Sequence, residues 1–136
     1  MEIKNKIFEG ERSLFSSCGL KIYDCIFQNG ESPLKESKDI YLKGSNFKWK
    51  YPLWYSNDIL VEDSKLDVTA RSGIWYTHNI TINNTLIEAP KTFRRSSFIT
   101  LNNVNMPNAL ETMWNCKNIV LNDVSVTGDY FAFGSE

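Results

Sequence analysis

Hydrophobic residues return along this chain in a pattern that repeats about every twenty residues. An aliphatic anchor opens each repeat, and successive anchors are 20, 19, 21, 19 and 20 residues apart. A second aliphatic residue follows two positions later, a small residue five later and a large apolar residue seven later. The anchors are Leu20, Ile40, Ile59, Ile80, Ile99 and Ile119. Self-similarity at a fixed period predicts a stacked, repeating architecture.

Each repeat also shows where its strands and bends should lie. The pairs at positions 0/+2 and +5/+7 from the anchor alternate as a strand does, with one face inward. A third short strand is predicted around the apolar residue six before each anchor. Position +4 holds Asp, Asn or Gly, which turn a corner at low cost. We therefore expect three strands and three bends per coil, with like residues stacked about 4.8 Å apart.

These patterns predict an all-β fold, a right-handed parallel β-helix of about six coils, as a single domain over residues 1–136. A leucine-rich repeat would need a helical return segment. A left-handed hexapeptide helix would show a six-residue subperiod, which is absent. A pentapeptide-repeat solenoid is the closest rival, because positions +2 and +7 are five residues apart. That five-residue rhythm fails in the second half of each coil.

Composition narrows the possible partners and the compartment. The 15 basic and 16 acidic residues nearly cancel, so the composition implies no nucleic acid or other polyanion as a partner. Neither a secretory signal nor a membrane-spanning apolar stretch is visible, which predicts a cytoplasmic protein without membrane contact. The three cysteines fall on different repeat positions and form neither a disulfide framework nor a zinc motif. We therefore expect no metal and no cofactor.

The side chains five residues before each anchor should point outward in one row. They are Phe15, Lys35, Trp54, Trp75, Arg94 and Trp114. Tryptophans edged by arginine suit the apolar faces and hydroxyls of a sugar chain, and they equally suit a protein partner or plain structural stacking. We predict Trp54, Trp75 and Trp114 as ligand-binding residues and leave these alternatives open.

Catalytic candidates are weak. A calcium-dependent lyase needs converging aspartates, and the corner aspartates are interrupted by Gly44, Asn84 and Asn103. A glycoside hydrolase needs two carboxylates about 5–9 Å apart. The candidates, none of which shows a signature spacing, are Glu11, Glu36, Arg71 and Arg94. If the protein is an enzyme, they would serve a polysaccharide lyase or glycoside hydrolase. The single histidine, His78, is interpreted as a solvated turn residue.

Five stretches spread over the whole chain carry a family resemblance: Phe8–Arg12 followed by Leu14 and Phe15, Leu34–Ser37, Tyr51–Ser56, Ile74–Tyr76 and Asp129–Phe131. They resemble a bacterial family of unknown function, domain of unknown function 3737. The resemblance implies a pectin-lyase-like right-handed parallel β-helix, and it implies that this chain is an N-terminal portion of a longer protein. That family has no established activity, so the resemblance supports the fold and leaves the chemistry open.

The C-terminal coil looks unfinished. Ser135 matches the small residue three before an anchor, so the next anchor would fall at position 138. The apolar segment Tyr130–Phe133 lies in this coil, and an open solenoid edge is a template for association. We expect either a continuation or a homodimer joined through the C-terminal coil. The functions left open are a non-catalytic scaffold that binds a protein or itself, and a carbohydrate-binding or carbohydrate-processing protein.

Overall fold

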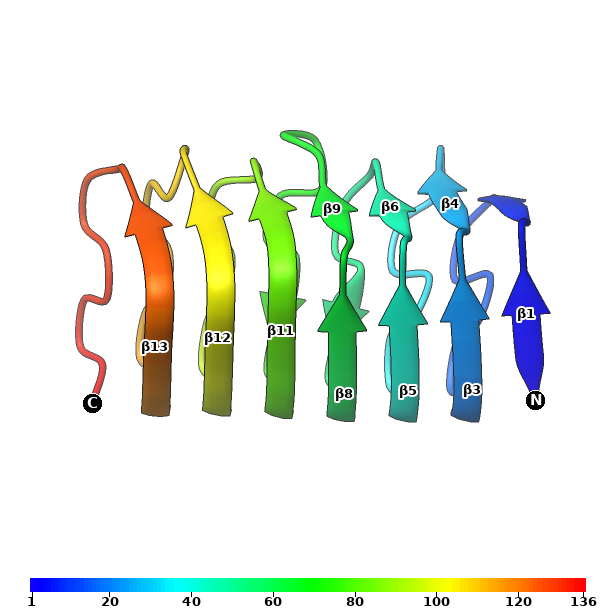
Figure 1. Ribbon diagram of the computed structural model, residues 1–136, viewed down its shortest axis with the longest axis horizontal. Coiled ribbons are helices and arrows are strands. Elements are labelled where there is room, and N and C mark those ends of the chain that lie inside the picture. Colours follow the sequence, from blue (N-terminus) through cyan, green and yellow to red (C-terminus); the bar gives the residue numbers. More distant parts are fainter.

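The computed structural model describes residues 1–136 as a stack of parallel β-strands without a helix. Successive coils lie side by side along the long axis, and the two termini lie at opposite ends (Figure 1). The strands are β1 (Glu2–Lys4), β2 (Ile7–Glu9), β3 (Cys18–Tyr23), β4 (Ile26–Gln28), β5 (Lys38–Lys43), β6 (Asn46–Phe47), β7 (Leu53–Trp54), β8 (Asn57–Glu62), β9 (Lys65–Leu66), β10 (Ile74–Trp75), β11 (His78–Ile87), β12 (Ser97–Met106) and β13 (Lys117–Val126).

The predicted register is confirmed. Every anchor pairs with the anchor of the next coil, from Leu20 beside Ile40 to Ile99 beside Ile119. The fold is therefore an all-β parallel solenoid of about six turns. Strand β1 adds a further row ahead of the first anchor, with Ile3 beside Ile22. The sequence did not indicate this row because Met1 occupies the anchor position. The handedness of the coil and its pectin-lyase-like character stay predictions.

The number of bends differs from the prediction. Position +4 is left-handed in every coil, from Asp24 at φ 53° to Asp123 at φ 53°, as expected from its residue types. Left-handed residues also recur eight, four and one positions before each anchor, so each coil has four such corners and not three. Tyr55, Tyr76 and Phe98 occupy some of them. Bulky residues do not favour this conformation by themselves, which is why the sequence pattern concealed these corners.

Two kinds of ladder fill the interior. The large apolar residues stack into one core of 26 buried residues. Within it Phe27 and Phe47 lie face to face with ring centroids 4.8 Å apart, and the partly buried Phe8 extends this stack with its centroid 5.1 Å from that of Phe27. The small residues form hydroxyl ladders. The amides of Ser17, Ser37, Ser56 and Thr77 each donate to the hydroxyl oxygen of the equivalent residue in the next coil, over 3.1–3.4 Å. Hydroxyls at these positions therefore satisfy buried backbone amides.

The cysteines belong to the packing of the coils. All three thiols are free, and Cys25 and Cys116 are buried. Burial raises the pKa of the Cys116 thiol to about 11, so this thiol stays protonated at neutral pH.

No helical segment of the structure has the length and apolar character needed to span a bilayer.

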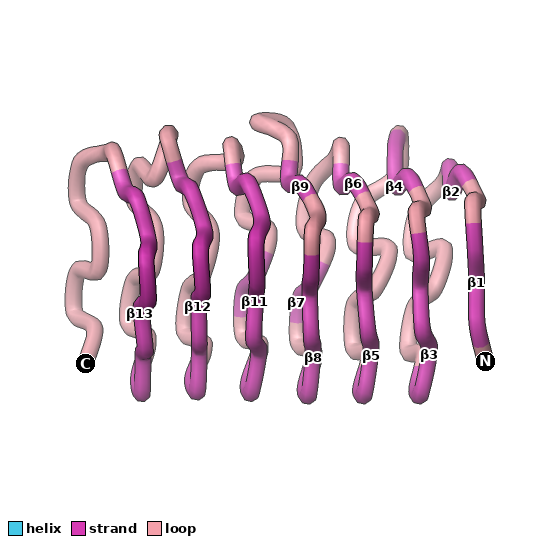
Figure 2. Tube along the Cα trace, viewed as in Figure 1, coloured by secondary structure: helices cyan, strands magenta, loops and turns pink.

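The third side of the coil is the least regular. Strands β7 and β10 pair in parallel, with Trp54 beside Trp75, and lie behind the long strands (Figure 2). Single bridges continue this row from Trp75 to Arg94 and from Arg94 to Trp114. The outward row that the sequence predicted five residues before each anchor is therefore continuous over these four coils.

Candidate functional site

One side of the solenoid concentrates aromatic and basic side chains. We define the aromatic–basic face as positions −5, −4 and −2 from the six anchors. Its aromatic members are Phe15, Trp54, Tyr55, Trp75, Tyr76 and Trp114. Its basic members are Lys35, Lys38, Arg94, Arg95 and Lys117, and it also holds His78. Glu36 is the one acidic residue among these positions. The face is therefore strongly basic in a chain whose total charge is close to zero.

The tryptophan row is a closed stack. Trp54 and Trp75 lie parallel, with ring centroids 5.1 Å apart and planes 5° apart. The guanidinium of Arg94 covers Trp75 at 4.4 Å and reaches Trp114 at 5.1 Å. The inner ring faces are thus occupied by one another and by Arg94.

The two outer faces of this stack are contacted by further aromatic rings. Tyr51 packs against Trp54 with ring centroids 4.3 Å apart, and Phe133 packs against Trp114 at 5.4 Å. We infer that the exposed parts of these half-buried tryptophans are their edges, which carry the positive part of the aromatic quadrupole.

The polar ends of the three indoles are also occupied. The Trp75 Nε1–H donates to the Lys91 carbonyl oxygen at 2.8 Å, and Trp54 and Trp114 make the equivalent bonds to Ser72 and Tyr130. These bonds lock each ring against the backbone of the following coil. The stack is consequently rigid, and no indole N–H is left to bind a ligand.

A second aromatic row runs beside the tryptophans at position −4. Tyr55 and Tyr76 stack with ring centroids 4.6 Å apart and planes 5° apart. Lys35 lies over the Tyr55 ring at 5.8 Å from its centroid. Tyr55 is 47% exposed and is therefore more open to a partner than Tyr76 and the three tryptophans, which are half-buried.

A hollow of about 440 Å³ opens at the C-terminal half of this face. Its lining residues are His78, Arg95, Ser96, Ser97, Asn115 and Lys117, from three consecutive coils. His78 Nδ1 lies 2.6 Å from Ser97 Oγ. None of the four ion pairs of the structure involves Arg95 or Lys117. We call this feature the basic hollow.

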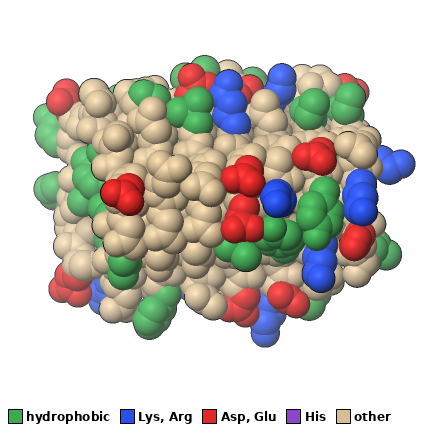
Figure 3. All heavy atoms as spheres, in the orientation of Figure 1, with side chains coloured by type: hydrophobic (Ala, Val, Ile, Leu, Met, Phe, Trp, Pro, Cys, Tyr) green, Lys and Arg blue, Asp and Glu red, His purple; other side chains and the backbone are tan.

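The neighbouring face, formed by the outer surface of the long strands, has the opposite character. This strand face consists of positions −1, +1, +3 and +4 from the six anchors. Its basic residues are Lys21 and Lys43, and its acidic residues are Asp24, Asp39, Asp58, Glu62, Asp63 and Asp123. The charged side chains gather over the N-terminal half, and the C-terminal half is almost uncharged (Figure 3).

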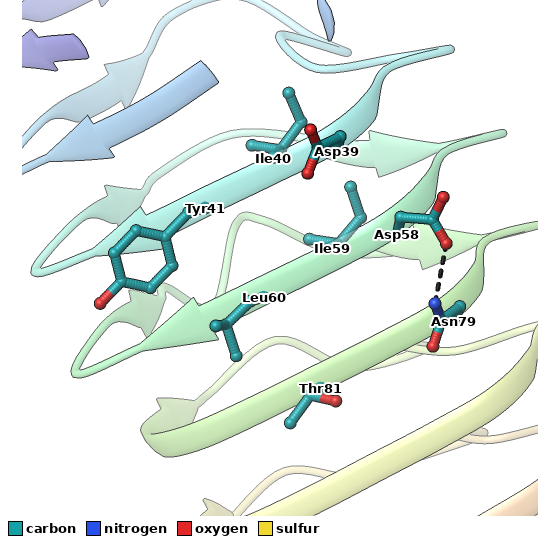
Figure 4. A pocket seen from close by; sticks show the side chains of 8 residues that line it. All are labelled: Asp39, Ile40, Tyr41, Asp58, Ile59, Leu60, Asn79 and Thr81. Atoms are coloured by element: carbon teal, nitrogen blue, oxygen red, sulfur yellow. Dashed lines mark hydrogen bonds between the residues drawn. The ribbon is translucent and has the colours of Figure 1, made fainter. Parts of the chain in front are cut away.

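A hollow of about 340 Å³ lies on this strand face, lined by Asp39 and Asp58 near the start of β5 and β8 and by Tyr41 and Leu60 farther along the same strands (Figure 4). Asp58 accepts a hydrogen bond from Asn79 over 2.7 Å. No group of three or more His, Cys, Asp or Glu residues is placed to hold a metal ion anywhere in the chain. Two carboxylates without a third ligand do not make a cation site of the kind that hard metals occupy.

A polar ladder crosses the strand face beside this hollow. The Tyr41 hydroxyl donates to Glu62, and Asn83 donates to the other carboxylate oxygen of Glu62 over 3.2 Å. Asn102 and Asn122 continue the ladder with amide bonds of 2.8 Å each. The bond to Glu62 raises the pKa of Tyr41 to about 12, and the donors lower the pKa of Glu62.

The four predicted catalytic candidates are spread over four coils of the stack. Glu11 and Arg71 share position −9, and Glu36 and Arg94 lie at positions −4 and −5. Within each of these pairs the partners are three coils apart, which is about 14 Å at the strand spacing. Arg71 lines a separate hollow of about 310 Å³ with Trp49 and Lys50. Glu11 and Glu36, the two carboxylates, lie on adjacent coils at different positions of the repeat. The catalytic role of all four residues stays a prediction.

Sequence reasoning missed the basic hollow. The notable signal was available in the repeat itself, because His78, Ser97 and Lys117 share position −2 and Arg95 and Asn115 share position −4. Residues that share a repeat position lie on adjacent coils. The spacing of positions −4 and −2 therefore predicts that these donors lie close together, in the same way that position −5 predicts the tryptophan row.

Comparisons with known proteins identify one family of unknown function. The profile of a family described as "Protein of unknown function (DUF3737)" matches residues 1–136. No protein with curated annotation matches the chain. Among solved structures, QnrB1, a plasmid-mediated fluoroquinolone resistance protein, is similar with 13% identity and a TM-score of 0.34 over 96% of this chain and 78% of that one.

A second solved structure is also similar. It is HetL, a pentapeptide repeat protein involved in heterocyst differentiation regulation from the cyanobacterium Nostoc sp. strain PCC 7120. The identity is 10% and the TM-score 0.23, over 100% of this chain and 84% of that one.

Proposed function

Since the chain belongs to the DUF3737 family of unknown function, we propose from its own surface that it is a non-catalytic scaffold whose aromatic–basic face binds an acidic segment of a partner protein. The observation that carries this proposal is the segregation of charge. Five basic residues and one acidic residue occupy the aromatic–basic face, although basic and acidic residues are almost equal in number over the chain. Complementary potentials steer a charged partner to such a surface and fix its orientation.

The aromatic geometry favours an acidic peptide over a sugar or a nucleic acid. Sugars and bases both bind aromatic side chains through the ring faces. In the Trp54–Trp75–Arg94–Trp114 row those faces are in contact with one another, with Arg94 and, at the two ends, with further aromatic rings. Exposed ring edges carry partial positive charge and attract carboxylate and carbonyl oxygens. The ring edges and the basic side chains of this face therefore both attract negatively charged oxygens, which supports an acidic protein ligand.

The proposal is tested by fluorescence anisotropy with labelled poly-L-glutamate. We expect binding that weakens as salt is added, because exposed charges are screened. Replacing Lys35 and Lys38 by Gln should weaken it about five- to tenfold, given up to about 1 kcal/mol for each exposed ion pair. The matched control replaces Lys21 and Lys43, which are exposed on the strand face, by Gln and should bind as the wild type does.

Three outcomes would contradict the proposal. One is equal loss in both double variants, which would mean attraction without a defined face. Another is equal or tighter binding of oligo-deoxythymidylate. The last is binding of a neutral glycan that disappears in Trp75→Ala, which would favour the carbohydrate-binding alternative and require the ring faces to become accessible.

A second candidate function, self-association through the C-terminal coil, rests on the end of the solenoid. Strand β13 pairs with β12 alone, and Val120 and Leu121 are 50% and 41% exposed there. Strand β1, at the other end, is short and carries the Glu2–Lys4 ion pair. Short, charged edge strands disfavour pairing with another chain. We propose that two copies of this chain pair through the β13 edge around a two-fold axis, which closes the assembly as a homodimer.

A further inference from the structure

The basic hollow has the composition of an oxyanion site. Five of the six lining residues carry a side chain that can donate a hydrogen bond to a ligand, and the lining holds no carboxylate and no apolar residue. The sixth, Ser96, is buried, and its hydroxyl donates to the Arg94 carbonyl oxygen. The volume of about 440 Å³ leaves ample room for a carboxylate and its first hydration waters. Neither Arg95 nor Lys117 forms an ion pair with an acid, unlike Lys91, which pairs with Glu111 at 3.6 Å. Both cations are therefore available to an anionic ligand.

The geometry also supplies neutral donors beside the cations. His78 Nδ1 and Ser97 Oγ are 2.6 Å apart and share one proton. If Ser97 donates, the imidazole carries its hydrogen on Nε2. If the imidazole donates, the Ser97 hydroxyl hydrogen is free. In either arrangement the pair keeps one donor for a ligand. On the coil after Lys117, the equivalent position −2 is occupied by Glu136. No ion pair joins Glu136 to Lys117, so this carboxylate does not neutralise the lysine.

We propose that the basic hollow is the subsite that binds one side-chain carboxylate of the acidic partner, held by Arg95 and Lys117 with His78 and Ser97 as neutral donors. This inference rests on the proposed function, because it names the group that anchors the acidic segment. Arg95 projects from the corner at position −4, with φ 48°, and Lys117 begins β13 on the next coil. The two cations thus line the hollow from adjacent coils, and a carboxylate offers two oxygens for them.

The site is tested by recording amide ¹H–¹⁵N spectra of the full chain during titration with sodium acetate, with sodium phosphate and with sodium chloride at constant ionic strength. We expect saturable shifts of the Ser96, Ser97 and Lys117 amides with acetate, in the millimolar range typical of a single weak contact. Arg95→Gln and Lys117→Gln should each weaken acetate binding about fivefold. Lys38→Gln, at the same position as Lys117 but outside the hollow, should leave it unchanged. The spectra also report whether each variant is folded.

The result that overturns the site is acetate shifts no larger than those with chloride. Saturation by phosphate alone would overturn the carboxylate assignment. Poly-L-glutamate binding that is indifferent to Arg95→Gln and Lys117→Gln, but is lost on removing Lys35 and Lys38, would overturn the subsite and leave the proposed function standing. Acetate saturation without any poly-L-glutamate binding would keep the oxyanion site and overturn the proposed function.

Discussion

At the residue scale, the shape of the coil depends on side chains that stabilise a left-handed backbone conformation at its corners. A left-handed conformation costs a non-glycine residue about 1–2 kcal/mol. Asp and Asn at position +4 reduce that cost by bonding their own backbone, so these corners could be predicted. Tyr55 and Tyr76 reach the same conformation at position −4, where they stack on each other at 4.6 Å. Such corners depend on a neighbour one coil away and could not be predicted from local preference.

Ser56 provides a test of the hydroxyl ladder. Its oxygen accepts the Ser37 amide and its hydroxyl donates to the Leu34 carbonyl over 2.9 Å. Ser56→Ala leaves a buried amide unpaired, so we expect the free energy of unfolding to fall by about 1–3 kcal/mol. Chemical denaturation measures this. Ser125→Ala, at an exposed position in β13, is the control and should stay within about 0.5 kcal/mol of the wild type. Equal stability of both variants would mean that the ladder contributes nothing.

Glu62 makes the stability of the folded chain depend on pH in the acidic range. The hydrogen bond from Tyr41 is the main reason that the pKa of Glu62 is lowered, and the bond from Asn83 adds to it. A lowered pKa in the folded state means that the stabilisation is present above the ordinary Glu pKa and is lost as pH falls through the lowered value. Tyr41→Phe should move the Glu62 pKa upward, as followed by carboxyl carbon NMR. Tyr23→Phe should leave it low, and a rise there as well would assign the shift to another cause.

At the element scale, the strands at positions 0/+2 and +5/+7 follow directly from alternation and pair as predicted. The sequence did not indicate that β11, β12 and β13 run as single ten-residue strands through the +4 corner, where earlier coils break. Asn103 bonds Asn84 over 2.9 Å at this corner, beside the Asn83–Asn102–Asn122 ladder. Amide ladders between coils therefore coincide with the uninterrupted strands, and they are contacts that a single repeat does not contain.

Adjacent residues of β11 test the inward and outward assignment. Ile80 is fully buried, so Ile80→Asp places an unpaired charge in the core and should cost several kcal/mol or prevent folding. Thr81 faces outward, and Thr81→Asp should change stability by less than about 1 kcal/mol. Thermal unfolding followed by circular dichroism compares the two. Similar melting of both variants would mean that the register along β11 is wrong.

At the scale of the whole molecule, stacking turns a balanced composition into faces of opposite charge. The totals of 15 basic and 16 acidic residues gave no reason to expect an acidic partner. The coil places positions −5, −4 and −2 on one side and collects most acids elsewhere. Aromatic residues in the −5 column could be predicted from spacing. That their ring faces are covered by Arg94 and by one another could not, because spacing does not report side-chain orientation.

Self-association is predicted at the same scale. Light scattering at micromolar concentration should give the mass of a dimer. Leu121→Glu places a charge on the open edge of β13 and should shift the protein toward the monomer, while circular dichroism confirms that it is folded. Leu110→Glu, at 39% exposure against 41% for Leu121, is the matched control and should remain dimeric. A wild-type protein that is monomeric throughout would contradict the proposed interface.

The central claim is that an acidic protein segment binds to the aromatic–basic face, and site-specific photo-crosslinking tests it most directly. A photoreactive phenylalanine analogue replaces Tyr76 on that face or Thr100 on the strand face, and each protein is irradiated with labelled poly-L-glutamate. The account predicts a crosslinked product from position 76 that added salt suppresses, and little or none from position 100. Equal products from both positions, or a product from position 100 alone, would contradict it.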